Sequence, residues 1–469
     1  MYNFHFGKVI AGVGPLLAKE TILSKVINMV DIFRISMSNG FDDNNKKYIE
    51  TVMKLDNSKT IMMETKWADL RIKNVKQVSL KKNQKILVDY SEYAQEADHK
   101  VFVDYPFVSH LKKGVRLLFR QSGVILEVVE IIKEEAECVV VQGGTIIEYD
   151  RLDFEGHDPE IIFLTDKDKK DITRGIENGV HIICGNYVRA ADDIMHLKTF
   201  LANHQRPNMK VFAKIETPEA IQHLQSIIDV SDGIIVSLDI VEPYFKKNKL
   251  TMDSIIALCK DVGKPAFLHY AHGVEGKSYP LLDKKHVLGY CEKALDGYMI
   301  ETMINEDDPL RVITALFEVV SEFPVAKSKK ESQPFYHPSD DFLVRDYIIY
   351  NAHKITEDLD VKAIVCFTHN GYTTARLSAL NPAVPIIAFS SVDETYRYIN
   401  TLRGVKGFKI SPHFNYTNLK RIGKEMIRII FKGNISLDDK IVIVQANELI
   451  NDEKTDLING VELYAFKNI

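Results

Sequence analysis

Two carboxylates and a lysine lie at the ends of two apolar runs within residues 211–242. Lys214 and Glu216 end the first run, and Asp239 follows the second, Gly233–Val236. Two carboxylates can hold a divalent metal ion, and a neighbouring lysine can neutralise the charge of a phosphoryl group. These residue types fit metal-assisted phosphoryl transfer, and they fit solvated polar groups at strand ends equally well.

A strand–helix–strand unit would bring these three side chains together. Val211–Ile215 and Gly233–Val236 are short apolar runs typical of buried strands, and Ala220–Ile228 between them has apolar residues at helical spacing. In a parallel βα unit the carboxyl ends of neighbouring strands face the same crevice. We therefore expect the lysine and both carboxylates to converge on one site.

The same alternation of strand and helix patterns extends through most of the chain. Candidate parallel strands occur near residues 8, 31, 60, 180, 211, 234, 267 and 298. Eight strands that alternate with helices predict a (β/α)8 TIM barrel, in the α/β class of folds.

Two further segments differ from the barrel pattern. Residues 67–158 have short alternating runs separated by Gly, Lys and Ser, which is typical of a small all-β domain. A polar, Pro-containing linker near 322–340 precedes a segment that reads as an α/β sandwich. We predict barrel parts at 1–66 and 159–330, an inserted β-barrel lid at 67–158, and a C-terminal α/β domain at 335–469.

The composition of the 469 residues is that of an ordinary soluble protein. A net charge of -5 without a long basic run argues against nucleic-acid binding. The five cysteines are widely spaced and form no C-x-x-C pair, so neither a zinc site nor a disulfide framework is indicated. We find no secretory signal pattern and no run of the ~18 apolar residues that a membrane span needs, so we expect a cytoplasmic protein.

The motifs of this chain resemble those of the pyruvate kinase family, in order and over essentially the whole length. Lys214–Glu216 reads Lys-Ile-Glu and Ser231–Ile234 reads Ser-Asp-Gly-Ile, as in the family, and Asp239 follows where the family has its metal-binding aspartate. The family usually continues Ala-Arg-Gly-Asp-Leu-Gly after that strand. This chain has Ser-Leu-Asp-Ile at Ser237–Ile240, two residues shorter and without the arginine.

The resemblance implies the glycolytic transfer of the phosphoryl group of phosphoenolpyruvate to ADP, which gives pyruvate and ATP. In the roles it implies, Glu216 and Asp239 ligate Mg²⁺ or Mn²⁺ and Lys214 stabilises the phosphoryl group in transfer. Arg34 would grip the substrate phosphate, since a guanidinium fork suits phosphate oxygens. Taken without the resemblance, Arg34 also fits a salt-bridged barrel residue.

The resemblance also implies a pocket for K⁺, formed by four oxygen-bearing residues: Ser36, Ser38, Glu64 and Thr65. The family has Asn, Ser, Asp and Thr there, so two of the four differ, and each replacement still offers an oxygen. At the entrance to the lid, Lys66 and Arg71 are the implied nucleotide- or substrate-binding residues.

The strand near residue 267 departs most from the family. Tyr270 stands where the family has a threonine that helps proton transfer, and its phenol can still donate a hydrogen bond. His269 and His272 form an HxxH pair, which fits packed or solvent-facing histidines better than a metal site. Such departures leave a second interpretation open, namely a catalytically silent homologue that serves as a binding or regulatory subunit.

A turn in the C-terminal segment has the pattern Thr-x-x-Gly-x-Thr-Thr. Thr368, Asn370 and Thr373 lie in it, at the start of a predicted helix. It can cradle the phosphate of an effector at a helix N-terminus, as in some family members, or simply cap the helix. The family's late glycine-rich effector loop is absent from 445–460. From the family's usual assembly we expect a homotetramer or homodimer.

Overall fold

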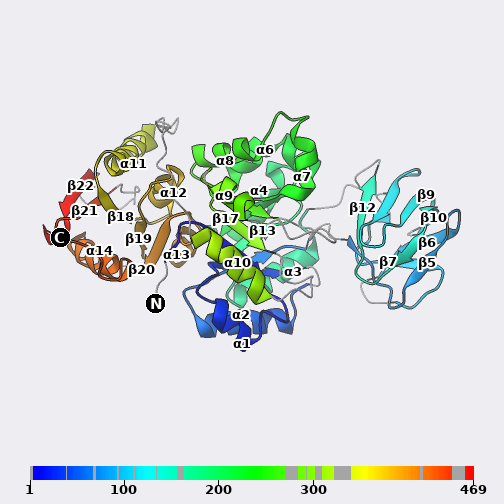
Figure 1. Ribbon diagram of the computed structural model, residues 1–469. Helices are drawn as coiled ribbons and strands as arrows, with labels where there is room; N and C mark the ends of the chain where they lie inside the picture. Colours follow the sequence, from blue (N-terminus) through cyan, green and yellow to red (C-terminus); the bar gives the residue numbers. More distant parts are fainter. Residues whose placement is uncertain are drawn as a thin grey trace. The chain divides into compact units, whose positions relative to one another are not determined.

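A computed structural model gives the fold of the chain (Figure 1). The residues that it describes are 4–37, 40–66, 70–91, 95–108, 111–133, 135–155, 163–269, 284–291, 293–300, 309–321, 340–411, 416–445 and 460–468. Contacts divide the chain into two compact units, one of residues 1–65 and 167–469 and one of residues 66–166. Each unit is described by itself.

Eight parallel strands close into a barrel in the order β1-β17-β16-β15-β14-β13-β3-β2. They are β1 (Lys8–Gly12), β2 (Ile32–Ser36), β3 (Thr60–Glu64), β13 (Ile182–Gly185), β14 (Lys210–Ile215), β15 (Gly233–Ser237), β16 (Ala266–His269) and β17 (Gly297–Ile300). The predicted barrel and its eight strand positions are confirmed.

Large apolar side chains fill the barrel, and a glycine allows its closure. Among the buried residues in its core are Ile10, Met62, Phe212 and Phe267. A Cβ atom at Gly297 would lie 2.0 Å from the carbonyl oxygen of Lys8, so only glycine allows β17 to approach β1 this closely. The barrel is therefore a packed core, and its chemistry must lie at the strand ends.

Helices follow the strands along the chain. They are α1 (Glu20–Val26), α2 (Asp43–Leu55), α3 (Asp166–Glu177), α4 (Ala191–Asn203), α5 (Pro218–Gln222), α6 (Leu224–Val230), α7 (Leu238–Phe245), α8 (Met252–Asp261), α9 (Lys284–Cys291) and α10 (Pro309–Ser321). The helix expected over Ala220–Ile228 is present as the two helices α5 and α6, because it is interrupted at His223, where ψ is 18°. Among the described residues, no helix is long and apolar enough to cross a membrane.

The unit of residues 66–166 is built of strands. A seven-stranded sheet has the order β4-β12-β8-β9-β10-β6-β7, and β11 pairs with β5. Its strands are β4 (Leu70–Arg71), β5 (Val78–Leu80), β6 (Lys85–Tyr90), β7 (Lys100–Val103), β8 (Arg116–Phe119), β9 (Ile125–Ile132), β10 (Glu135–Gln142), β11 (Gly144–Ile146) and β12 (Arg151–Glu155). Buried and more exposed residues alternate along β9 and β10, as in a sheet with one covered face.

The C-terminal part is a five-stranded sheet with helices on both faces. The order β20-β19-β18-β21-β22 joins β18 (Val361–Phe367), β19 (Ile386–Ser390), β20 (Val405–Lys409), β21 (Lys440–Gln445) and β22 (Gly460–Ala465). Apolar residues of α11 (Asp340–Asp358), α12 (Tyr372–Ala379) and α13 (Asp393–Ile399) pack on one face of the sheet. Those of α14 (Tyr416–Ile430) pack on the other. The predicted α/β sandwich is confirmed.

Candidate active site

Four charged side chains meet at the carboxyl ends of three barrel strands. Arg34 lies on β2, Glu64 ends β3, and Lys214 lies on β14 with Glu216 just after it. Arg34 Nη1 is ion-paired with Glu64 Oε2. Lys214 Nζ lies 2.8 Å from Glu64 Oε1 and 3.4 Å from Glu216 Oε2. The barrel therefore assembles a chain of alternating positive and negative groups.

Burial makes these charges interact strongly. The four side chains are at most 6% exposed. Burial acts to raise the pKa of the Glu64 carboxyl, but the Arg34 and Lys214 cations outweigh it and hold that pKa well below its usual range. Burial acts to lower the pKa of the Lys214 ammonium, but Glu216 and Glu64 outweigh it and hold that pKa above its ordinary value. Glu64 and Lys214 thus stay ionised at neutral pH.

A strained turn after β13 fixes the carboxylate of Glu216. Tyr187 has a φ of 52°, in the left-handed region that non-glycine residues seldom adopt. Its backbone N–H donates to Glu216 Oε1 at 3.1 Å. Backbone strain of this kind is common at functional sites, where neighbouring structure holds it in place.

Asn186, in the same turn, was not recognised from the sequence. Its backbone N–H donates to Thr65 Oγ1 at 3.1 Å, which joins the ends of β13 and β3. The Asn186 side chain is 7% exposed, and its Oδ1 has no hydrogen-bond partner within the described part of the chain. The only signal in the sequence was its position directly after a predicted strand.

Asp239 lies in the first turn of α7, directly after β15. Ile215 is in register with Val236, so Glu216 and Ser237 follow at neighbouring strand ends. Across the described residues, no group of three or more His, Cys, Asp or Glu side chains is arranged to hold a metal ion. Glu216 and Asp239 fit Mg²⁺, which proteins commonly bind through one or two carboxylates together with substrate oxygens.

A serine–histidine pair lies at the ends of β15 and β16. Ser237 and His269 are in register, and Ser237 Oγ lies 3.0 Å from His269 Nδ1. Both side chains are buried, with 0% and 2% exposed. The sequence favoured a packed or solvent-facing histidine over a metal ligand and gave no sign of its partner. Tyr270, the predicted proton-transfer residue, lies outside the described residues.

Three of the four predicted K⁺ ligands, Ser36, Glu64 and Thr65, lie at the ends of β2 and β3. Ser36 is in register with Glu64, and Thr65 follows β3 with only 4% of its surface exposed. The fourth, Ser38, lies outside the described residues. Sequence reasoning placed Glu64 in this cation pocket and did not foresee its contact with Lys214, 150 positions away.

Lys66 and Arg71 belong to the unit of residues 66–166. Lys66 is ion-paired with Asp104, whose Oδ1 also accepts a hydrogen bond from the backbone N–H of Arg71 at 2.9 Å. The Arg71 guanidinium donates to the carbonyl oxygen of Tyr149 at 3.1 Å. Both predicted nucleotide- or substrate-binding residues thus share one acidic partner, and their binding role stays a prediction.

The predicted effector turn begins α12. The backbone N–H of Gly371 donates to Thr368 Oγ1 at 3.0 Å, and that of Tyr372 donates to Asn370 Oδ1 at 2.9 Å. Gly371 has a φ of 94°, which favours glycine at this position. Thr368 and Thr373 are buried, with 1% and 0% exposed. Side-chain hydrogen bonds thus hold the turn ahead of α12, and phosphate binding there stays a prediction.

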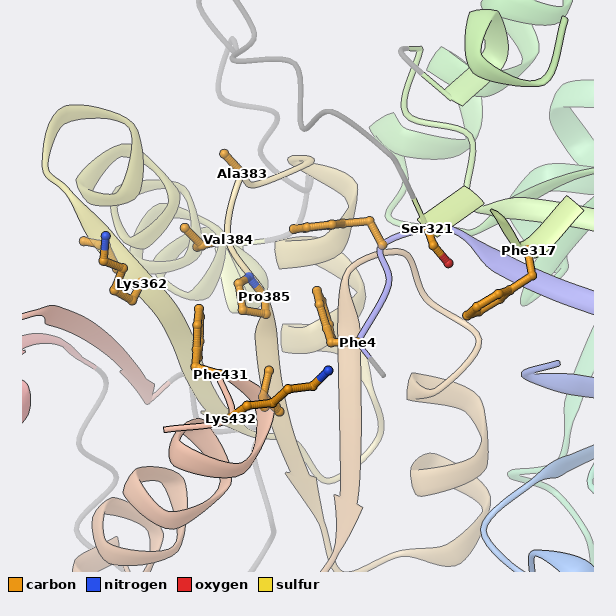
Figure 2. A pocket seen from close by; sticks show the side chains of 12 residues that line it. Phe4, Phe317, Ser321, Lys362, Ala383, Val384, Pro385, Phe431 and Lys432 are labelled. Carbon is orange, nitrogen blue, oxygen red and sulfur yellow. The ribbon is translucent and has the colours of Figure 1, made fainter. Parts of the chain in front are cut away.

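The larger of the two described cavities lies away from these charged groups. It has a volume of about 530 Å³ and is lined by residues that precede β1, by the end of α10, and by the C-terminal domain. Figure 2 shows its aromatic walls, including Phe4, Phe317 and Phe431, with Lys362 and Lys432 beside them. Its lining has no carboxylate, so it contains none of the residues predicted to bind a metal ion.

Comparison with known proteins agrees with this architecture. Residues 5–269 match the family model "Pyruvate kinase, barrel domain", and residues 346–459 match "Pyruvate kinase, alpha/beta domain". Pyruvate kinases of two Staphylococcus aureus strains, MRSA252 and USA300, are each 25% identical over 416 residues, covering 85% of this chain and 71% of theirs.

A solved structure has the same fold. The crystal structure of a pyruvate kinase from Cryptosporidium parvum aligns with a TM-score of 0.78 at 19% identity, over 98% of this chain and 96% of that one. The barrel model alone spans more than half of the residues. This chain belongs to the pyruvate kinase family.

Proposed function

We propose that this protein transfers the phosphoryl group of phosphoenolpyruvate to ADP, giving pyruvate and ATP in glycolysis. The observation that carries the proposal is the buried chain Arg34–Glu64–Lys214–Glu216 at the carboxyl end of the barrel. Phosphoryl transfer depends mainly on positioning of the reactants and on electrostatic stabilisation of the phosphoryl group as it is transferred. A lysine and an arginine held rigidly by buried carboxylates meet both needs.

Each charged residue has a role in this proposal. Lys214 Nζ faces the phosphoryl group and stabilises its developing charge, and Arg34 orients the phosphate oxygens. Glu216 and Asp239 would hold Mg²⁺ or Mn²⁺, which as a Lewis acid draws charge from the phosphoryl oxygens. The backbone N–H of Tyr187 keeps the Glu216 carboxylate oriented for that purpose. We also propose a homotetramer or homodimer, as is usual in the family.

A coupled assay with phosphoenolpyruvate, ADP, Mg²⁺ and K⁺ tests the proposal, with Lys214→Met as the variant. Loss of the ammonium should reduce kcat by about 10²-fold or more, since it removes a charge aimed at the transition state. Lys210→Met is the matched control, because Lys210 begins the same strand and its Nζ lies 3.7 Å from Asp232. It should retain turnover.

Folding must be checked for both variants. Lys214→Met leaves Glu64 and Glu216 buried with one cation fewer, which costs about 3–5 kcal/mol where a buried ion pair is broken. Near-ultraviolet circular dichroism separates an inactive folded variant from an unfolded one. No pyruvate formation by folded wild-type protein, at high substrate and with Mn²⁺ offered, would refute the kinase proposal.

The sequence at the junction of β15 and α7, Ser237–Ile240, favours a second candidate, a catalytically silent homologue that binds ligands or regulates a partner. This connection is two residues shorter than the family's usual motif and lacks its arginine, and Tyr270 replaces the threonine of the proton-transfer step. Isothermal titration with phosphoenolpyruvate and Mg²⁺ distinguishes the two candidates. Binding without turnover by folded protein would favour the silent homologue.

A further inference from the structure

Glu64 has cationic side chains on both of its carboxylate oxygens. Arg34 is paired with Oε2, and Lys214 Nζ lies 2.8 Å from Oε1. The three side chains are 2%, 4% and 6% exposed, in the order Arg34, Glu64, Lys214. Water therefore screens these contacts little, and each oxygen already has a charged partner.

The charges around Glu64 are already balanced. With Glu216 included, two positive and two negative side chains alternate, and their formal charges sum to zero. A further cation bound by Glu64 would lie against both Arg34 and Lys214. In a buried site such like-charge contacts are strongly unfavourable, and the cation would also lose its hydration.

Side-chain length explains why Glu64 reaches both cations. The resemblance places an aspartate of a K⁺ site at this position, and glutamate is longer by one C–C bond, about 1.5 Å. The hydroxyl of Thr65, another residue of the implied site, already accepts a hydrogen bond from the backbone N–H of Asn186. Glu64, with a protein cation on each carboxylate oxygen, therefore does not fit a K⁺ site.

We propose that Glu64 makes the site independent of a monovalent cation, because Arg34 and Lys214 occupy both of its carboxylate oxygens and leave neither to bind K⁺. The part of this inference that concerns turnover rests on the proposed phosphoryl transfer. The part that concerns cation binding is independent of that proposed function.

Cation binding is measured first, without substrate. The unfolding temperature of wild type in about 100 mM KCl should equal that in tetramethylammonium chloride of the same ionic strength. Glu64→Asp moves the carboxylate away from the two cations, and the unfolding temperature of this variant should be higher in KCl than in tetramethylammonium chloride. Glu50→Asp is the matched control, because Glu50 lies exposed on α2. The unfolding temperatures of this variant in the two salts should be equal.

A saturable, K⁺-specific rise in wild type would overturn the proposal. If Glu64→Asp folds and gains no K⁺ response, the assignment of cation independence to Glu64 is wrong. If Glu64→Asp does not fold, ²⁰⁵Tl NMR of wild type decides the question with Tl⁺ as the probe. Unchanged ²⁰⁵Tl linewidths support the proposal, and saturable broadening that K⁺ reverses overturns it.

Turnover provides the second test. Exchange of K⁺ for tetramethylammonium should change wild-type kcat by less than about twofold and should reduce that of Glu64→Asp by about tenfold or more. Activation of wild type by K⁺ of about tenfold or more would refute cation independence. Absence of turnover with every cation would refute the proposed function instead, and the binding measurements would still test the role of Glu64.

Discussion

At the scale of single residues, position in the barrel decides how deeply a charged side chain is buried. Glu64 and Lys214 are buried and stabilise each other at 2.8 Å, whereas Asp239 lies in the first turn of a helix and is only partly buried. The same principle applies away from the active site. His181 precedes β13, and its Nδ1 accepts a hydrogen bond from the backbone N–H of Ile61 at 2.9 Å. That bond requires a neutral ring.

The histidine at position 181 makes stability depend on pH. Burial, with the nearby Arg397 cation, lowers its pKa to about 3, and Asp393 opposes this only in part. The unfolded chain takes up this proton near pH 6.5, so its contribution to stability is complete above pH 6.5 and is lost as the pH falls toward 3. The loss amounts to at most about 4–5 kcal/mol.

His181→Asn tests this linkage, because the asparagine oxygen can accept the same hydrogen bond without taking up a proton. The denaturation midpoint of the variant should fall less than that of wild type between pH 7 and pH 4. His204→Asn, at an exposed position after α4, serves as the control and should follow wild type. Equal acid sensitivity of wild type and His181→Asn would contradict the expected pKa.

At the scale of elements, caps and turns set the directions in which the strand ends point. Helix α2 follows the strand that carries Arg34. It begins with a capping box, in which Asp42 accepts from the backbone N–H groups of Asn44 and Asn45 at 2.9 Å. The Asn45 side chain in turn accepts from the backbone N–H of Asp42 at 2.9 Å. The cap defines where the loop after β2 ends.

Removal of this cap should weaken α2. Asp42→Ala should lower the free energy of unfolding by about 1 kcal/mol, because two backbone donors lose their acceptor. Asp43→Ala, one position into the helix, removes an acidic side chain from the same turn without touching the capping box. Urea denaturation of the two variants checks the difference, and an equal loss from both would assign the effect to helix charge alone.

At the scale of the whole molecule, the C-terminal domain is bonded to the barrel within one compact unit. Arg397 of α13 donates to the carbonyl oxygens of Asn57 and Lys59, both at 2.8 Å. Thr60 Oγ1 donates back to the carbonyl oxygen of Arg397 at 3.1 Å. Asp296 accepts from the backbone N–H of Arg403 at 3.1 Å. These contacts lie at the amino ends of β3 and β17, opposite the active site.

Arg397→Met should therefore weaken the connection between the two domains. Loss of two charge-assisted hydrogen bonds should cost about 2–4 kcal/mol and separate their thermal transitions. Arg428→Met is the matched control, because Arg428 lies exposed on α14 and its contacts with Glu425 and with the ring of Phe466 stay within the C-terminal domain. Differential scanning calorimetry measures both variants. A single unshifted transition for Arg397→Met would show that the remaining contacts, such as that of Asp296 with Arg403, are enough to join the domains.

Much of this organisation followed from the sequence by itself. The barrel strands are local patterns, and each can be recognised from a few consecutive apolar residues. Lys214, Glu216 and Asp239 could be expected to meet because parallel strands end at one face of a barrel. The interruption of the predicted helix at His223 could not be foreseen, because that helix continues its apolar spacing across the break.

Only the tertiary structure decided which side chains became partners. The pairs Glu64–Lys214, Ser237–His269 and Asn186–Thr65 join residues 150, 32 and 121 positions apart. Each pair depends on the register between strands, and the pair Glu64–Lys214 also depends on side chains long enough to meet across the barrel. No local sequence pattern encodes either property. The sequence thus determined the set of charges at the strand ends. Barrel closure decided that Glu64 would be neutralised by two protein cations.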